Sequence, residues 1–109
     1  MRRPKLKMAN VTYELFHCSR EFFNFSQFGS CREIRRLYLE GCYQLVHTFR
    51  KPAKQLDHRL EEVFEESQNI ETSWRGSNPC RSTSVGDIVR VGRDYWIVAA
   101  FGFVRGWRE

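Results

Sequence analysis

The stretch that decides the fold is Arg81–Phe103, which reads RSTSVGDIVRVGRDYWIVAAFGF. Its small polar residues and Gly86-Asp87 predict a turn, because Ser and Asp side chains bond to nearby backbone amides and Gly adopts unusual backbone angles. Two apolar segments follow, with Gly92-Arg93-Asp94 between them. We therefore expect a β-hairpin of residues 87–91 and 95–104. The second strand is apolar on both faces, which predicts a central position in a sheet.

The same stretch can be compared with a loop that cradles a phosphate. Such a P-loop needs two glycines, a lysine and a Ser or Thr at fixed spacing. Residues 84–87 offer one Gly, no Lys and a carboxylate where the anion would lie. The sequence therefore favours a turn over a phosphate-binding loop.

Outside this stretch, two further segments alternate between apolar and polar residues, as strands do. The first, residues 11–18, reads VTYELFHC. The second, residues 42–50, reads CYQLVHTFR. Its alternation places four side chains on one face, namely Tyr43, Leu45, His47 and Phe49.

Two segments have helical spacing instead. Residues 31–40 follow Ser30, which forms a capping-box pattern with Glu33. Residues 53–67 carry a helical stripe of apolar side chains at Leu56, Leu60, Val63 and Phe64. Glu65 and Glu66 stand at the C-terminal end of this second helix, where the helix dipole disfavours anions. A basic neighbour or partner would reduce this repulsion between the two carboxylates and the helix dipole.

Together these elements predict one α+β domain, a small antiparallel β-sheet packed by two helices, in the order strand, helix, strand, helix, strand, strand. Residues 1–9 are expected to be a basic flexible arm, and residues 10–109 the single domain. Of the 109 residues, 41% are hydrophobic and 15% are aromatic, which is enough material for one core. Residues 67–84 are rich in Ser, Asn and Gly and predict a long loop, a kind of segment that is often functional.

Nothing in the sequence supports a membrane protein, a secreted protein, a metal site or a cofactor site. No apolar run approaches the roughly 20 residues that span a membrane, and the basic N-terminus lacks the apolar stretch of a secretory signal. We therefore expect a cytoplasmic protein with no membrane contact. The cysteines at 18, 31, 42 and 80 form no CxxC pair and have no zinc-finger spacing. They are expected to be thiols, with no metal site and no cofactor.

The net charge of +5 is unevenly distributed along the chain. Residues 57–71 hold six carboxylates and one arginine, so the remainder is strongly basic. Its basic residues gather in segments 2–7, 32–36 and 50–54. A basic surface beside an acidic helix suits nucleic acid, an acidic protein partner, or solubility alone.

Four sequence blocks, with a loop that contains Trp and Asn before the third, occur in an order that is similar to a known family. They are Tyr43-Gln44-Leu45-Val46, Leu60-Glu61-Glu62-Val63-Phe64, Arg81–Asp87 and Phe101-Gly102-Phe103. In this order the chain resembles the YodL-like domain family of phages, plasmids and conjugative elements, although Thr83 and Ala99-Ala100 depart from its usual residues. The resemblance implies a phage or mobile-element accessory protein in the cytoplasm of an infected or element-carrying host cell. It implies no catalytic residues.

An enzyme is the function class that the residues support least. A cysteine nucleophile needs a base within hydrogen-bond reach and a third group to orient it. His17 and Cys18 are neighbours in a strand and point to opposite faces, while His47 belongs to an apolar face and His58 to the acidic helix. We therefore expect no catalytic residues.

The two remaining classes are both binding functions. We expect a non-catalytic module that docks on a host or defence protein, because Trp and Arg are enriched in binding hot spots. The expected partner-binding residues are Trp74, Arg75 and Trp107. The alternative is a nucleic-acid-binding protein with a basic face made of Arg32, Arg35, Arg36, Arg50 and Lys51. Open strand edges would also allow a homodimer.

Overall fold

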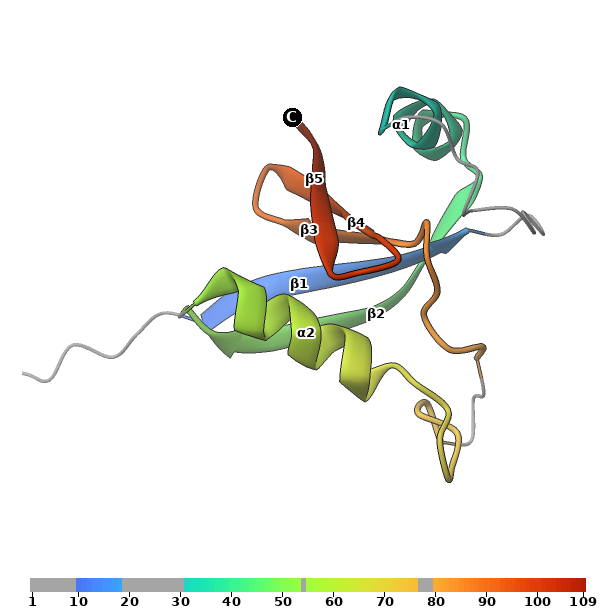
Figure 1. Cartoon of the computed structure of the whole chain (residues 1–109), viewed down its shortest axis with the longest axis vertical. Helices are drawn as coiled ribbons and strands as arrows, with labels where there is room; N and C mark the ends of the chain where they lie inside the picture. Colours follow the sequence, from blue (N-terminus) through green and yellow to red (C-terminus); the bar gives the residue numbers. More distant parts are fainter. Residues whose placement is uncertain (1–9, 19–30, 54, 77–79) are drawn as a thin grey trace, which may run out of the picture.

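The computed structural model describes residues 10–18, 31–53, 55–76 and 80–109. The elements in these ranges are β1 (Asn10–Cys18), α1 (Cys31–Leu39), β2 (Tyr43–Pro52), α2 (Leu56–Glu66), β3 (Ile88–Val91), β4 (Asp94–Val98) and β5 (Phe103–Arg108) (Figure 1). All strands pair antiparallel in one sheet of order β2-β1-β3-β4-β5. The predicted α+β class is thereby confirmed, with one more strand than expected. The predicted arm of residues 1–9 and the capping residue Ser30 lie outside the described residues.

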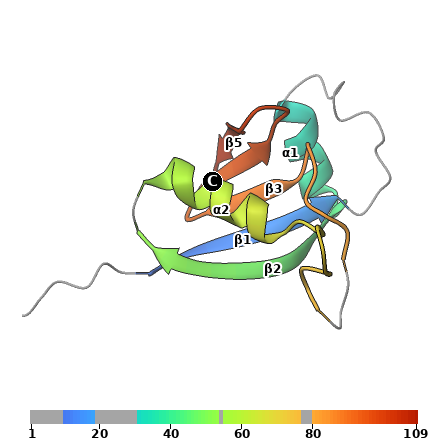
Figure 2. The ribbon, with the colours of Figure 1, turned by 60° about the horizontal axis from the view of Figure 1, so that its bottom comes forward.

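The two helices pack on opposite faces of the sheet (Figure 2). Helix α2 buries Leu60 and Val63 in a cluster with Leu15 of β1. Helix α1 buries Ile34 in a second cluster, with Phe16 of β1. Because consecutive residues of a strand point to opposite sides, Leu15 and Phe16 mark the two faces of the sheet. The sheet is therefore covered by one helix on each side.

A β-bulge in the pairing of β1 with β2 changes which residues of β2 share a face. Leu15 pairs with His47, but its neighbour Phe16 pairs with Leu45, so Val46 is the extra residue. The extra residue reverses the alternation. Phe49 consequently packs in the α2 cluster and Tyr43 in the α1 cluster. The prediction that Tyr43, Leu45, His47 and Phe49 line one face was wrong for this reason.

The predicted hairpin is present, but its second strand is shorter than expected. Strand β3 turns into β4 at Gly92, which has φ +63° as a tight turn requires. Strand β4 ends at Val98, and residues 99–102 form a second turn that Gly102 closes at φ +76°. The single strand predicted for residues 95–104 is therefore two strands, because an apolar run alone cannot distinguish a buried strand from an exposed turn.

No helix within the described ranges is long and apolar enough to cross a membrane.

Candidate functional site

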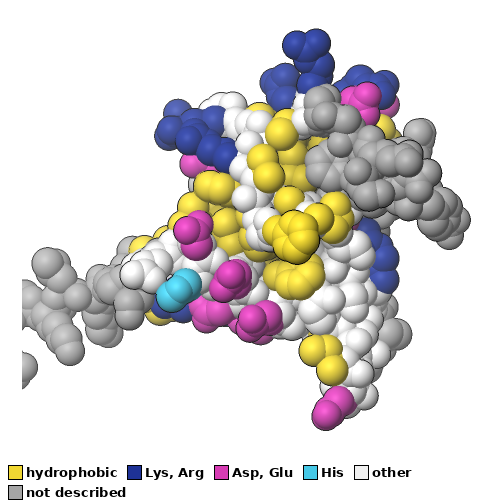
Figure 3. All heavy atoms as spheres, in the orientation of Figure 1, with side chains coloured by type: hydrophobic (Ala, Val, Ile, Leu, Met, Phe, Trp, Pro, Cys, Tyr) yellow, Lys and Arg dark blue, Asp and Glu magenta, His cyan; other side chains and the backbone are white. Residues whose placement is uncertain are grey.

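A hollow of about 320 Å³ lies between α2 and the turn that joins β4 to β5, and we call it the apolar hollow. Its lining residues are Glu61, Phe64, Glu65, Val98, Ala99, Ala100, Gly102 and Phe103. In the space-filling view, apolar side chains gather in the middle of this face, with acidic side chains beside them over α2 (Figure 3). The hollow therefore combines apolar lining residues with two carboxylates of α2.

Phe101 stands in the turn beside this hollow and is 96% exposed. The turn is held by a hydrogen bond from the Ala99 amide to the Gly102 carbonyl, at 2.9 Å. A fully buried phenylalanine contributes about 1.5–3 kcal/mol relative to an exposed one, and the fold gains none of this from Phe101. An exposed aromatic ring next to an apolar hollow is the kind of patch that marks an interaction site.

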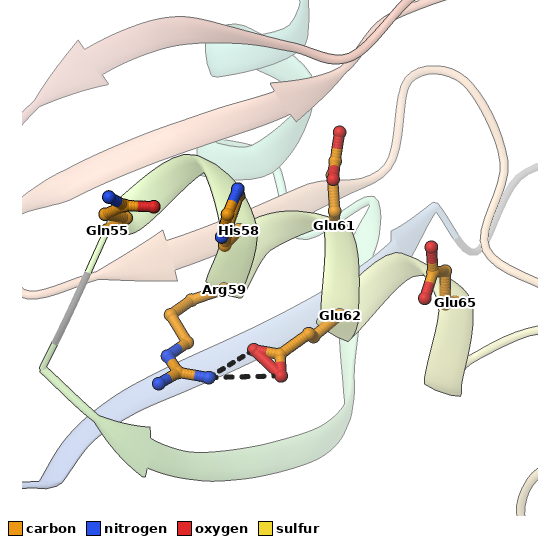
Figure 4. Close-up of a pocket in the computed structure, with 6 residues that line it drawn as sticks. All are labelled: Gln55, His58, Arg59, Glu61, Glu62 and Glu65. Atoms are coloured by element: carbon orange, nitrogen blue, oxygen red, sulfur yellow. Dashed lines mark hydrogen bonds and ion pairs between the residues drawn. The ribbon is translucent and has the colours of Figure 1, made fainter.

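The outer side of α2 forms a second, more polar hollow of about 480 Å³ (Figure 4). Arg59 and Glu62 point toward one another there, and the Arg59 guanidinium donates two hydrogen bonds to the Glu62 carboxylate. These hydrogen bonds lower the pKa of Glu62. Glu61 and Glu65 point away from this pair and line both hollows. We call Glu61 and Glu65 the acidic ridge.

The acidic ridge is not arranged as a metal site. Among the described residues, no group of three or more His, Cys, Asp or Glu side chains is placed to hold a metal ion. The four cysteines all lie in described ranges and form no disulfide bond.

Trp74, a predicted partner-binding residue, is half-buried against the sheet. Its ring centroid lies 5.6 Å from that of His47 and 6.4 Å from that of Phe49. Its indole N–H donates to the Arg81 carbonyl at 3.0 Å, and the Arg75 guanidinium lies 6.0 Å from the ring centroid. The ring thus ties the loop to the sheet, and a binding role for Trp74 and Arg75 stays a prediction.

Trp107, the third predicted partner-binding residue, belongs to the other face of the sheet. It stacks on Tyr95 with 4.6 Å between ring centroids and lies 5.8 Å from the Tyr38 ring of α1. Trp74 packs against the α2 cluster and Trp107 against the α1 cluster. The structure does not bring Trp74 and Trp107 together.

The predicted basic face divides into two separate groups. Arg32, Arg35 and Arg36 are exposed on α1, whereas Arg50 and Lys51 lie at the far end of β2 (Figure 1). A ten-residue strand is about 33 Å long. The Lys51 amine also forms an ion pair with Glu66 of α2 at 2.5 Å. The structure therefore keeps the three arginines of α1 together but separates them from Arg50 and Lys51.

The stretch Arg81–Asp87 forms the predicted turn, and the structure shows in addition that the turn surrounds a buried carboxylate. Asp87 is fully buried, and its side chain accepts a hydrogen bond from the Ser84 amide at 2.7 Å and another from the Cys18 amide at 3.1 Å. Arg81 adds a two-pronged ion pair with the same carboxylate. The carboxylate thus occupies the place that an anion would take in a phosphate-binding loop.

A thiol–imidazole contact that the sequence did not predict lies beside this turn. The Cys80 sulfur is 3.4 Å from His17 Nδ1, and His17 Nε2 is 2.9 Å from the Thr83 hydroxyl. Burial lowers the pKa of His17 to about 4, although Asp87 opposes the change. A cysteine nucleophile is activated by a nearby positive charge such as a protonated histidine. Near pH 7 His17 is therefore neutral, so its imidazole can accept a hydrogen bond from the thiol but supplies no positive charge to stabilise a thiolate.

The residues that sequence reasoning missed are those of the apolar hollow. Phe101 was placed inside a strand, so its exposure was not expected. One signal was available, because Glu65 at the C-terminal end of a helix is unfavourable unless a cation lies nearby. The last turn of α2 carries no basic residue.

No protein-family model, no curated protein and no solved structure matches this chain, so its resemblance to the YodL-like family stays a prediction from its motifs.

Proposed function

We propose that this chain is a non-catalytic protein-binding module whose binding surface is the apolar hollow with Phe101 and the acidic ridge. The single observation that carries the proposal is the exposure of Phe101, at 96%, beside an open hollow of about 320 Å³. Binding hot spots combine an aromatic anchor with a pocket that excludes water. The resemblance to YodL-like domains suggests a host or defence protein as the partner of a phage or mobile-element accessory protein.

Several features support this surface over the predicted site at Trp74. The Trp74 ring is half-buried, and its N–H is already bonded to the loop backbone. The Phe101 ring is not buried and has no group that could form such a hydrogen bond. The side chains of Ala99 and Ala100 beside it are small and leave the hollow open. A partner side chain can therefore reach the hollow without unfolding any part of the chain.

A selection that does not presuppose the partner tests this proposal. A display library of random peptides is selected against the full chain, and the enriched peptides are measured by fluorescence anisotropy. We expect them to lose about tenfold or more in affinity on Phe101→Ser, the order of loss for a hot-spot residue. Backbone amide shifts of Ala99, Ala100 and Gly102 should move when the peptide binds.

Ile70→Ser is the matched control, because Ile70 is 83% exposed but lies in the loop after α2. The control should bind as the native chain does. Enriched peptides that bind the native chain and Phe101→Ser equally would reject this surface. A selection that enriches no peptide would count against a protein-binding function.

The exposed arginines of α1 favour nucleic-acid binding as a second candidate. Arg32, Arg35 and Arg36 share one short helix and all are exposed. Binding through phosphates would weaken steeply with salt. The test is the anisotropy of labelled single-stranded and duplex DNA with the full chain, at low and high salt. If this function is correct, the chain binds DNA in a salt-dependent way and the triple change to glutamine abolishes this binding. An absence of binding, or binding that the triple change leaves unchanged, would reject it.

A further inference from the structure

The charge of the proposed binding surface indicates the chemistry of its partner, and this inference rests on the proposed function. We infer that the surface binds a basic protein segment, which places one apolar side chain in the apolar hollow and two basic side chains against Glu61 and Glu65. The occupant is thus a Lys- or Arg-rich segment with an apolar anchor.

The first argument is that some carboxylates of α2 already have basic partners among the described residues, whereas those of the acidic ridge do not. Glu62 is held by Arg59, and Glu66 is paired with Lys51 of β2. Within the described part of the chain, no ion pair involves Glu61 or Glu65. These two residues line both hollows, so an incoming segment meets them directly.

The second argument comes from the helix itself. The C-terminal end of an α-helix carries a partial negative charge, which cations stabilise and anions destabilise. Helix α2 ends at Glu66 and has no basic residue in its last turn. Lys51 of β2 pairs with Glu66 at this end, and Glu65 adds a further negative charge where the helix is already negative. A bound cation would relieve this repulsion, so the surface favours a basic partner over an acidic one.

The third argument is the spacing of the acidic ridge. Glu61 and Glu65 are four residues apart on one helix, which separates them by about 6 Å along its axis. Two basic side chains one turn apart on a partner helix have the same spacing, as do alternate residues of an extended segment. Phe64 lies between them in the sequence and lines the apolar hollow. Apolar and ionic contacts can therefore form with the same segment.

The test uses three short synthetic peptides that share one central leucine and differ in their flanking residues, which are arginine, serine or glutamate. Each is titrated against the full chain by fluorescence anisotropy. We expect the arginine peptide to bind at least about tenfold more tightly than the serine peptide, and the glutamate peptide to bind most weakly. High salt should reduce the difference between the peptides.

Charge-neutral variants locate the effect. The double variant Glu61→Gln/Glu65→Gln should reduce the affinity for the arginine peptide about tenfold and leave the serine peptide unchanged. Glu40→Gln/Glu71→Gln alters the net charge equally, at exposed positions that line neither hollow, and should have little effect.

The outcomes separate this inference from the proposed function. The inference of a basic partner would be overturned if all three peptides bind equally tightly. It would also be overturned if the two double variants lose equal affinity for the arginine peptide. If the serine peptide then binds the native chain but not Phe101→Ser, the proposed protein-binding surface is still supported. Failure of all three peptides would also overturn the basic partner, while the display selection decides the proposed function independently.

Discussion

The Arg81 guanidinium and the Asp87 carboxylate form two parallel hydrogen bonds, from Nη1 to Oδ2 at 2.7 Å and from Nη2 to Oδ1 at 2.8 Å. Arg81 also donates to the Cys18 carbonyl at 3.3 Å, at the end of β1. This ion pair joins the loop after α2 to the start of β3 and to the end of β1. The fold thus uses one buried carboxylate to hold three segments together.

Removing either partner of this pair should destabilise the fold. Arg81→Gln leaves the Asp87 charge buried without its cation, which costs about 3 kcal/mol, the lower end of the usual range because the Arg81 side chain is 43% exposed. Asp87→Asn replaces one carboxylate oxygen by an NH2 group, so either the Ser84 or the Cys18 amide loses its acceptor, and the change should cost about 2–3 kcal/mol. Urea unfolding measures both. The double variant should cost clearly less than the two losses added together, and strict additivity would show that the pair does not act as a unit.

Stability should fall at acidic pH because of His17. Burial, opposed by Asp87 and reinforced by Arg81 and Arg75, lowers the folded-state pKa from 6.5 to about 4. The unfolded chain therefore binds the proton first. The stabilisation is fully present above about pH 6.5 and is lost as the pH falls toward about 4, by about 3 kcal/mol.

Urea unfolding at a series of pH values measures this loss against His17→Gln, which has no group to titrate at this position. The difference between the native chain and the variant should shrink as the pH falls. A difference that stays constant with pH would contradict the buried neutral imidazole.

Two tyrosines allow a matched comparison of hydroxyl groups. The Tyr43 hydroxyl donates to the Gly86 carbonyl at 2.6 Å, whereas the Tyr38 and Tyr95 hydroxyls are 3.4 Å apart. Tyr43→Phe should therefore destabilise the chain by about 1 kcal/mol, and Tyr38→Phe by less. Thermal unfolding of the two half-buried positions tests the order, and an equal loss would show that the shorter hydrogen bond adds nothing.

Gly106 in β5 is required for space. A Cβ atom there would lie 2.9 Å from Cδ1 of Ile97 and 3.1 Å from the Tyr95 carbonyl oxygen. Gly106→Ala should cost about 1–3 kcal/mol, as overpacking does. Ile97→Val removes Cδ1 and alone costs about 0.5–1.5 kcal/mol. In the double variant part of the overpacking should be relieved, so its loss of stability should be smaller than the sum of the two single losses. Denaturant unfolding measures these losses, and simple addition would refute the clash.

Phe101 and Phe103 should respond differently to the same substitution. Phe101→Ser should change the free energy of unfolding by no more than about 0.5 kcal/mol, since the ring is 96% exposed. Phe103→Ser should cost about 2 kcal/mol, because this ring is half-buried against the α2 cluster. Differential scanning calorimetry compares them. Comparable losses would mean that Phe101 supports the fold, and Phe101→Ser would no longer be a clean binding variant.

Patterns within a few residues predicted most of the fold. The helical stripe predicted α2, the alternation predicted β1 and β2, and Gly92 marked the turn between β3 and β4. The turn at Arg81–Asp87 was also predictable, since its ion pair joins residues only six apart. The candidate site was less accessible, because whether Phe101 lies in a strand or in a turn depends on where Gly102 reverses the chain.

The sequence by itself determined the α+β class, the positions of both helices and the acidic character of α2, because helix periodicity, turn residues and local charge act over a few residues. Only the tertiary structure decided which surfaces form. The bulge at Val46 assigned the residues of β2 to two faces, the length of β2 separated the basic groups, and His17 met Thr83 across 66 residues. The apolar hollow beside the acidic ridge likewise depends on packing α2 against the distant turn between β4 and β5. Contacts of this kind arise from how the sheet is paired and packed, which local sequence patterns do not encode.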